Sequence, residues 1–189
     1  RAAPARVRWI DLHNVLGVAA AAWLVIVGAT GFMNALEGPL FAAWDGALME
    51  RLLTPYRGKP YPDHLVSADA ALAAALHAKP GMIATSIGFP YSAFGSPRHY
   101  LIWLKGDAPL TSHFFTPVLI DAASGRLASA EPLPWYLRVL EISRPLHFGD
   151  YGGTALQVIW AGLDLLAIAI LLSGLYLWFA RRSRRAPAP

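Results

Sequence analysis

Two histidines stand beside the two most apolar stretches of this chain. His13 lies at the start of the stretch 12–36, and His147 precedes the stretch 155–180 by eight residues. Imidazole titrates near neutral pH and is a common ligand of haem iron. We therefore expect these two side chains to hold a haem iron or a proton where each stretch meets a boundary of the membrane.

Both stretches are long enough to cross a bilayer. About twenty apolar residues, each rising about 1.5 Å along a helix, span a hydrocarbon core of about 30 Å. The first stretch has only Thr30 as a weakly polar interruption between residues 15 and 33, whereas the second contains Gln157, Asp164 and Ser173. Together with a hydrophobic content of 56%, this pattern predicts a membrane protein in contact with the lipid bilayer.

The position of the arginines predicts the orientation. Seven of the sixteen Lys and Arg residues lie in the two tails: Arg1, Arg6, Arg8, Arg181, Arg182, Arg184 and Arg185. Because basic residues favour the cytoplasmic side, we expect both termini in the cytoplasm and the central region in the periplasm of a bacterial inner membrane. The basic tails also account for the net charge of +4, so no nucleic-acid partner is expected.

The first apolar stretch is expected to remain as a helix. It is longer than the apolar core of a typical signal peptide, and no clear A-x-A cleavage site precedes Glu37. The chain has no cysteine, which excludes disulfides, thiol catalysis, iron–sulfur clusters and cysteine zinc sites.

The central residues predict a small α+β domain. An amphipathic helix over 41–53 is expected at the outer membrane interface, followed by a proline-rich linker over 54–63. Ser67 is expected to cap a helix over 69–77. Three strands are expected over the ranges 82–89, 99–105 and 114–121, with a turn at 122–125. The expected organisation is 1–36 tail and first transmembrane helix, 37–66 interfacial helix and linker, 67–131 periplasmic domain, 132–154 interfacial helix and loop, and 155–189 second transmembrane helix and basic tail.

At this point the residues resemble a known family. The helix 68–77, the segment Lys79-Pro80-Gly81 and the strand that ends in Asp121-Ala122-Ala123-Ser124-Gly125-Arg126-Leu127 are similar to the PepSY domain, whose final hairpin carries D-x-x-[ST]-G-x-[LV]. Three flanking elements resemble PepSY-associated transmembrane proteins. They are Leu12-His13-x-x-x-Gly17, Leu146-His147-x-Gly149-x-x-Gly152, and Ser173-Gly174-Leu175-Tyr176-Leu177-Trp178 followed by arginines.

The resemblance implies a role linked to iron. Many members accompany iron uptake, and some with four transmembrane helices resemble haem b ferric-siderophore reductases in which histidines at both leaflets ligate haem. For this chain it implies His13 and His147 as haem ligands and an oxidoreductase component that resembles a ferric reductase. The chain departs from the four-helix pattern because it has two spanning helices and one histidine for each leaflet, so a homodimer or other membrane subunits would have to supply further ligands.

Small residues on the first apolar stretch suggest a packing face. Gly17, Gly28 and Gly31 fall on the side of His13 at helical spacing. Such a face permits close approach of another helix, or leaves room for a flat macrocycle beside a ligating histidine. Asp164 has two interpretations: a proton relay or polar contact to another subunit, and a hydrogen bond to Thr30, Asn34 or Trp23.

Two functions of other classes remain open. One is a non-catalytic accessory subunit of a larger membrane complex, and the other is a periplasmic module that binds a protein or restrains a peptidase. No hydrolase, nucleotide-triphosphatase or dinucleotide motif appears in the sequence. The remaining histidines are expected at the surface: His64, His77, His99 and His113.

Overall fold

The computed structural model describes residues 5–92 and 96–182. The tail residues Arg1, Arg184 and Arg185, on which part of the orientation argument rests, lie outside the described residues. The chain divides into two compact units: a helix-pair unit made of residues 1–32 and 145–189, and a sheet unit made of residues 33–144.

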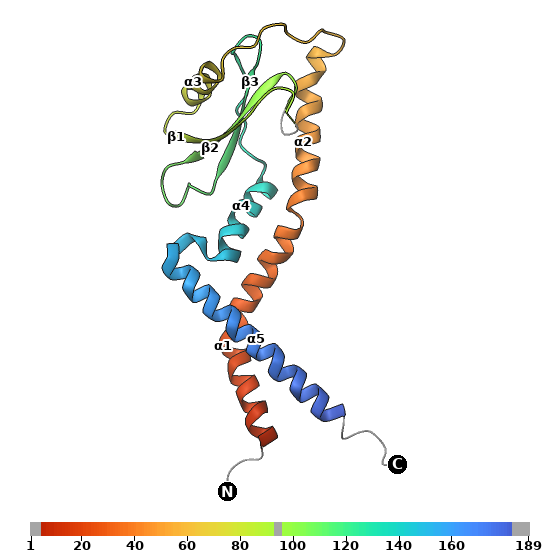
Figure 1. Cartoon of the computed structure of the whole chain (residues 1–189), viewed down its shortest axis with the longest axis vertical. Coiled ribbons are helices and arrows are strands. Elements are labelled where there is room, and N and C mark those ends of the chain that lie inside the picture. The colour runs from red at the N-terminus through yellow and green to blue at the C-terminus, as the bar shows by residue number, and fades with distance from the viewer. Residues whose placement is uncertain (1–4, 93–95, 183–189) are drawn as a thin grey trace. The chain divides into compact units, whose positions relative to one another are not determined.

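The helix-pair unit is built on two long apolar helices, α1 (Ala5–Ala35) and α5 (Gly153–Arg182). They cross each other in Figure 1, and both belong to helical runs long and apolar enough to span a membrane. Their outer surfaces carry exposed aliphatic side chains, such as Val18 and Leu165, as expected of helices that face lipid. Two helices long and apolar enough for the expected membrane spans are thus present.

The sheet unit has the expected α+β order. It contains α2 (Glu37–Leu53), η1 (Thr54–Tyr56), α3 (Ala68–Ala78), β1 (Met82–Gly88), β2 (His99–Gly106), β3 (Phe115–Asp121), β4 (Leu127–Ser129) and the first part of α4 (Trp135–Phe148). The strands form an antiparallel meander in the order β1-β2-β3-β4. Ser67 caps α3 as expected, because its Oγ accepts a hydrogen bond from the Ala70 N–H at 3.2 Å.

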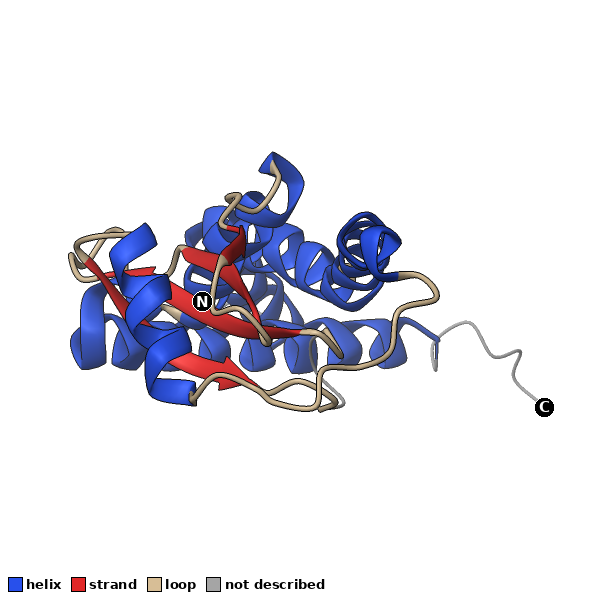
Figure 2. Ribbon diagram, turned by 90° about the horizontal axis from the view of Figure 1, so that it is seen from above, coloured by secondary structure: helices blue, strands red, loops and turns tan. Residues whose placement is uncertain are grey.

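Both faces of this sheet are covered, as Figures 1 and 2 show from two directions. Alternate residues of a strand point to opposite faces, so Ile102 of β2 packs with α3 while Leu101 packs with Leu48 of α2. Trp44 and Leu52 of α2 join the second cluster. The apolar side of 41–53 that the sequence assigned to the membrane interface is therefore covered by the sheet.

The segment 121–127 that resembles the PepSY signature forms a turn. The Asp121 Oδ1 accepts hydrogen bonds from the backbone N–H groups of Ala123 and Ser124 and from the Ser124 hydroxyl. Gly125 adopts the left-handed φ of +69° that closes the turn. The second oxygen of Asp121, Oδ2, accepts the Tyr56 hydroxyl at 2.6 Å. The signature therefore organises the hairpin and fastens the segment after α2 to the sheet.

His99 does not lie at the surface, which corrects the sequence expectation. It is 1% exposed, its Nδ1 lies 2.7 Å from Ser96 Oγ, and its ring packs edge-on against the Tyr56 ring. Burial lowers the pKa of His99, Asp121 opposes the shift, and Arg98 adds to it. The surface expectation failed because residue type alone does not show that this strand residue faces into the fold.

Arg98 fixes the proline-rich segment that the sequence analysis described as a linker. Its guanidinium donates hydrogen bonds to the backbone carbonyls of Lys59 and Pro60 and lies against the rings of Tyr56 and Tyr61. A carbonyl that accepts from a charged guanidinium forms a strong hydrogen bond. The segment is thus held to the sheet unit by specific contacts.

Candidate functional site

His13 of α1 reaches across to α5. Its Nδ1 lies 2.8 Å from Ser173 Oγ, and its ring lies over Gly174, where an added Cβ would be 3.3 Å from the His13 Cε1. The Ser173 hydroxyl donates its own proton to the Ile170 carbonyl at 2.7 Å. The glycine at position 174 therefore leaves room for the His13 ring, and the hydroxyl of Ser173 is hydrogen-bonded to that ring.

His147 makes an equivalent contact, but its partners lie on α1 and not on α5. It lies in the last turn of α4, and its Nδ1 lies 3.1 Å from Thr30 Oγ1 and 3.2 Å from the Val27 carbonyl oxygen. An added Cβ at Gly31 would be 3.1 Å from the His147 Cε1. Each histidine thus contacts a hydroxyl residue and the glycine that follows it. These pairs are Ser173-Gly174 for His13 and Thr30-Gly31 for His147.

The turn between α4 and α5 positions His147. Gly149 has a φ of +70°, and an added Cβ there would lie 2.9 Å from Cγ of Trp160. The indole N–H of Trp160 donates to the Leu146 carbonyl at 3.1 Å. Glycine is therefore required at position 149 by backbone conformation and by close packing, which explains part of the motif L-H-x-G-x-x-G.

The hydrogen-bond geometry favours one tautomer of each ring. Thr30 donates its hydroxyl proton to the Ile26 carbonyl at 2.7 Å, and Ser173 donates to Ile170, so each hydroxyl oxygen accepts from the histidine. The Val27 carbonyl beside His147 is an acceptor only. In the neutral ring the proton therefore resides on Nδ1, and Nε2 presents a lone pair. Neither Nε2 has a hydrogen-bond partner within residues 5–92 and 96–182.

The two rings lie at separate levels of the helix pair. His13 and Thr30 are seventeen residues apart on α1, which corresponds to about 25 Å along the helix axis. Because His147 is hydrogen-bonded to Thr30, one metal ion cannot bind both imidazoles. Among the residues that the structure describes, no group of three His, Asp or Glu side chains suits a metal ion.

The glycines of the small-residue face predicted on α1 have different surroundings in the structure. Gly31 contacts His147, whereas an added Cβ at Gly17 or Gly28 would meet nothing within 4 Å. Gly17 is half-buried and Gly28 is exposed. Only part of this face therefore serves the contact with α5 and His147.

Asp164 lies on the exposed side of α5. It makes no hydrogen bond or ion pair with any residue in the described part of the chain. Thr30 is occupied by His147 and by carbonyls of its own helix, and Asn34 accepts from Ser143. The hydrogen bond from Asp164 to Thr30, Asn34 or Trp23 is therefore not formed.

Sequence reasoning missed the partners of the two histidines. Ser173 and Thr30 were noted as polar interruptions of apolar helices, and Gly174 as part of a motif. The available signal was the recurrence of a hydroxyl residue followed by glycine, once in each long helix. A pair of this type in an apolar helix offers an acceptor and open space to a ring from a neighbouring helix.

The comparisons with known proteins agree with this architecture. The family model described as the PepSY-associated TM region matches residues 1–181. The chain is also 27% identical over 204 residues to an uncharacterized protein of Pseudomonas aeruginosa strain PAO1, PA4219. That match covers 94% of this chain and 50% of the relative, so the chain spans about half the length of the curated relative that it matches. The match over nearly all of its residues shows that the chain is a membrane protein of the PepSY-associated transmembrane family.

Proposed function

We propose that this protein binds haem b through Nε2 of His13 and Nε2 of His147 and takes part in electron transfer across the bacterial inner membrane. The observation that carries the proposal is the pair of Nδ1 hydrogen bonds, at 2.8 Å to Ser173 and 3.1 Å to Thr30. They leave a lone pair on each Nε2 and hold each ring in one orientation, which is what a metal-ligating imidazole requires.

The residues around each ring fit this role. Haem, when bound, supplies one-electron redox chemistry. The hydroxyls of Ser173 and Thr30 keep Nδ1 protonated, and the glycines at 174 and 31 leave room for the imidazole beside the helix backbone. Aliphatic side chains on the outer surfaces of α1 and α5 provide an apolar environment for a macrocycle. All of these features belong to the helix-pair unit.

A second protein ligand at either level would come from beyond the residues of this sequence. Each level of the helix pair has one histidine, and the two levels are about 25 Å apart. The relative from Pseudomonas aeruginosa is about twice as long as the part that this chain matches. A twin copy of the chain, or a second pair of helices, would supply a further histidine at each level.

The proposed direction of transfer follows from the arginine-rich tails. We place both termini in the cytoplasm and the sheet unit in the periplasm. A reporter fused after Pro189 should then show cytoplasmic behaviour, and one inserted near Gly58 should show periplasmic behaviour. The proposed reaction is the reduction of a ferric complex on the periplasmic side, or the passage of electrons within a larger redox assembly.

The test is the absorption spectrum of the full chain purified in mild detergent. We expect a Soret band and, after reduction, sharp α and β bands. His13→Ala and His147→Ala should each remove one haem population and leave the other, while His64→Ala, which changes an exposed histidine, should leave both. A folded protein without these bands would refute haem binding and favour the accessory-subunit function. Loss of all haem after either single change would contradict two separate sites.

A further inference from the structure

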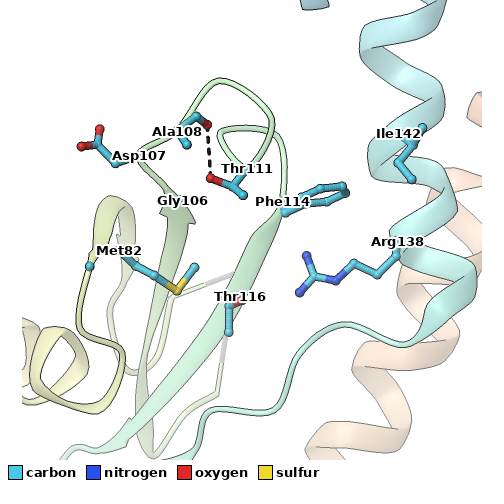
Figure 3. Close-up of a pocket in the computed structure, with 10 residues that line it drawn as sticks. Met82, Gly106, Asp107, Ala108, Thr111, Phe114, Thr116, Arg138 and Ile142 are labelled. Atoms are coloured by element: carbon cyan, nitrogen blue, oxygen red, sulfur yellow. Dashed lines mark hydrogen bonds between the residues drawn. The ribbon is translucent and has the colours of Figure 1, made fainter.

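The sheet unit contains a cavity that is separate from the histidine sites. Its volume is about 650 Å³, and it lies between α4 and the end of the sheet where β2 finishes and β3 begins. This size is typical of pockets for small organic ligands. Figure 3 shows Met82, Phe114 and Ile142 around an open centre with Arg138 directed into it.

Arg138 is fixed in place by contacts that a solvated surface arginine lacks. Its Nη1 donates to Glu141 Oε2 at 2.8 Å, and the other oxygen of Glu141, Oε1, accepts the backbone N–H of Phe115 at 2.8 Å. The Glu141 side chain is only 6% exposed. The guanidinium also lies 5.6 Å from the centre of the Phe114 ring. Glu141 thus anchors the guanidinium to the sheet before any ligand arrives.

Most of the donors of Arg138 remain available. A guanidinium carries five N–H groups, and the bond to Glu141 is the one hydrogen bond that Arg138 makes to any residue the structure describes. Arg98, in contrast, donates to two backbone carbonyls. The remaining N–H groups of Arg138 therefore face the cavity without a protein acceptor (Figure 3).

Thr116 provides a second, independent polar group in the same cavity. It is 6% exposed, and it lines the cavity together with Arg138. Its hydroxyl has no hydrogen-bond partner in the described ranges of the chain. The hydroxyl is therefore available to a ligand or to solvent in the cavity.

The loop 107–114 lines one side of the cavity, and its conformation depends on a glycine. The Gly106 N–H donates to the Thr111 carbonyl, and the Thr111 hydroxyl donates to the Ala108 carbonyl. A Cβ added at Gly106 would overlap the Thr111 side chain. The wall of the cavity is therefore a folded part of the sheet unit with its own hydrogen bonds.

We propose that this cavity binds a small organic carboxylate with an aromatic or other apolar body. Arg138 and Thr116 both offer donors, so the ligand must present two acceptor oxygens, and a planar carboxylate matches the guanidinium fork. A carboxamide of the same shape replaces one oxygen by an NH₂ group, which would meet the N–H groups of Arg138 donor to donor. The apolar body of the ligand lies against Met82, Phe114 and Ile142.

The test uses the full chain in phosphatidylcholine nanodiscs and 4-fluorobenzoate as the probe. We expect the ¹⁹F resonance of 4-fluorobenzoate to broaden in the presence of the protein and to recover when unlabelled benzoate is added. The matched neutral probe, 4-fluorobenzamide, should broaden far less. The assay needs no haem, so its outcome is independent of the proposed electron transfer.

Three variants locate the probe. Thr116→Val keeps the shape of the side chain and removes the hydroxyl, and the paired change Arg138→Met with Glu141→Gln avoids a buried unpaired carboxylate. Each should raise the Kd of 4-fluorobenzoate about tenfold or more. Arg57→Met changes an exposed arginine whose Nη2 lies 3.8 Å from Glu50 Oε1. This variant should leave the Kd unchanged. The proposal is overturned if wild type does not broaden the resonance, if the amide binds as well as the carboxylate, or if Thr116→Val and the paired variant bind like wild type.

Discussion

A metal-ligating imidazole usually donates a hydrogen bond from the N–H of its other ring nitrogen to a carboxylate, a carbonyl or water. In this protein the hydroxyls of Ser173 and Thr30 lie beside Nδ1 of His13 and His147, the proposed haem ligands. The two sites are not equal, because His147 Nδ1 also lies 3.2 Å from the Val27 carbonyl, while His13 Nδ1 has Ser173 as its one partner among the described residues. The difference makes the two histidines distinguishable by mutation.

Removal of each hydroxyl should therefore have unequal effects, given the proposed haem sites. Ser173→Ala leaves His13 Nδ1 without an acceptor and should weaken haem binding at His13 by about 10–100-fold. Thr30→Val leaves the Val27 carbonyl in place and should weaken the His147 site less. Haem titration into the apoprotein measures both affinities, and a redox titration measures the accompanying shifts in potential. Thr85→Val, which removes a hydroxyl on the sheet, is the control. Equal losses at the two sites would contradict the geometry.

His99 gives the sheet unit a dependence on pH. Burial lowers the pKa of His99 in the folded state, so between that lowered value and about 6.5 the unfolded chain binds more protons than the folded one. The free energy of unfolding should accordingly rise with pH in this window and fall as the pH drops below about 6.5. Thermal unfolding followed by circular dichroism at pH 7.5 and 5.5 should show the slope in wild type and a smaller slope in His99→Gln.

The same experiment has an internal control. Burial raises the pKa of Glu141, against the opposing effects of the Phe115 N–H and Arg138, and a raised carboxyl pKa gives a slope of opposite sign. That contribution is present in both proteins and cancels in the difference. An identical pH slope in wild type and His99→Gln would show that His99 is not held neutral by the fold.

At the level of elements, the turn between α4 and α5 determines where His147 lies. Gly149→Ala introduces a Cβ at a φ of +70° and 2.9 Å from the Trp160 ring. We expect a loss of about 2 kcal/mol or more in stability and displacement of His147, with loss of its haem alone. Gly162→Ala, in an open position of α5, should change little. Thermal unfolding and the haem content of each variant check the prediction, and unchanged haem in Gly149→Ala would show that the turn does not position the histidine.

The regular elements were predictable because each has a local cause. The apolar stretches, the Ser67 cap and the alternating strands follow from residue order, and the structure has helix α3 and strands β1, β2 and β3 within one or two residues of the expected ranges. The turn at Asp121 was also recognisable from its glycine and its hydrogen-bonding side chains. These patterns need no knowledge of distant contacts.

Contacts between distant elements could not be obtained in this way. The pairing of His13 with Ser173 joins residues 160 positions apart, and that of His147 with Thr30 joins residues 117 positions apart. The burial of His99 and the covering of α2 by the sheet likewise depend on which faces meet in three dimensions. The sequence supplied the two histidines, but only the fold shows which ring nitrogen each one leaves available.

At the scale of the whole molecule, two features of the helix-pair unit support the proposed twin copy or partner subunit. Gly28 is exposed with open space around it, and Asp164 is an exposed carboxyl on α5 that no residue of the described chain engages. A carboxyl group at the centre of a membrane-spanning helix costs roughly 2.5–3.5 kcal/mol on insertion unless it finds a polar contact. In hydrocarbon, close helix approach through small residues is a main source of association.

Gly28→Leu should therefore separate the chain from its twin or partner while the chain itself stays folded, because the added side chain meets no atom of its own structure. Asp164→Leu should weaken association only if the carboxyl contacts the partner. Co-purification of two differently tagged copies and sizing in detergent measure both effects, with Gly46→Leu, at an equally open position of α2, as the control. Since each level of the helix pair has one histidine, haem should be lost together with the partner. A chain that is a lone, cofactor-free monomer before and after these changes would refute both the electron-transfer function and the accessory-subunit alternative.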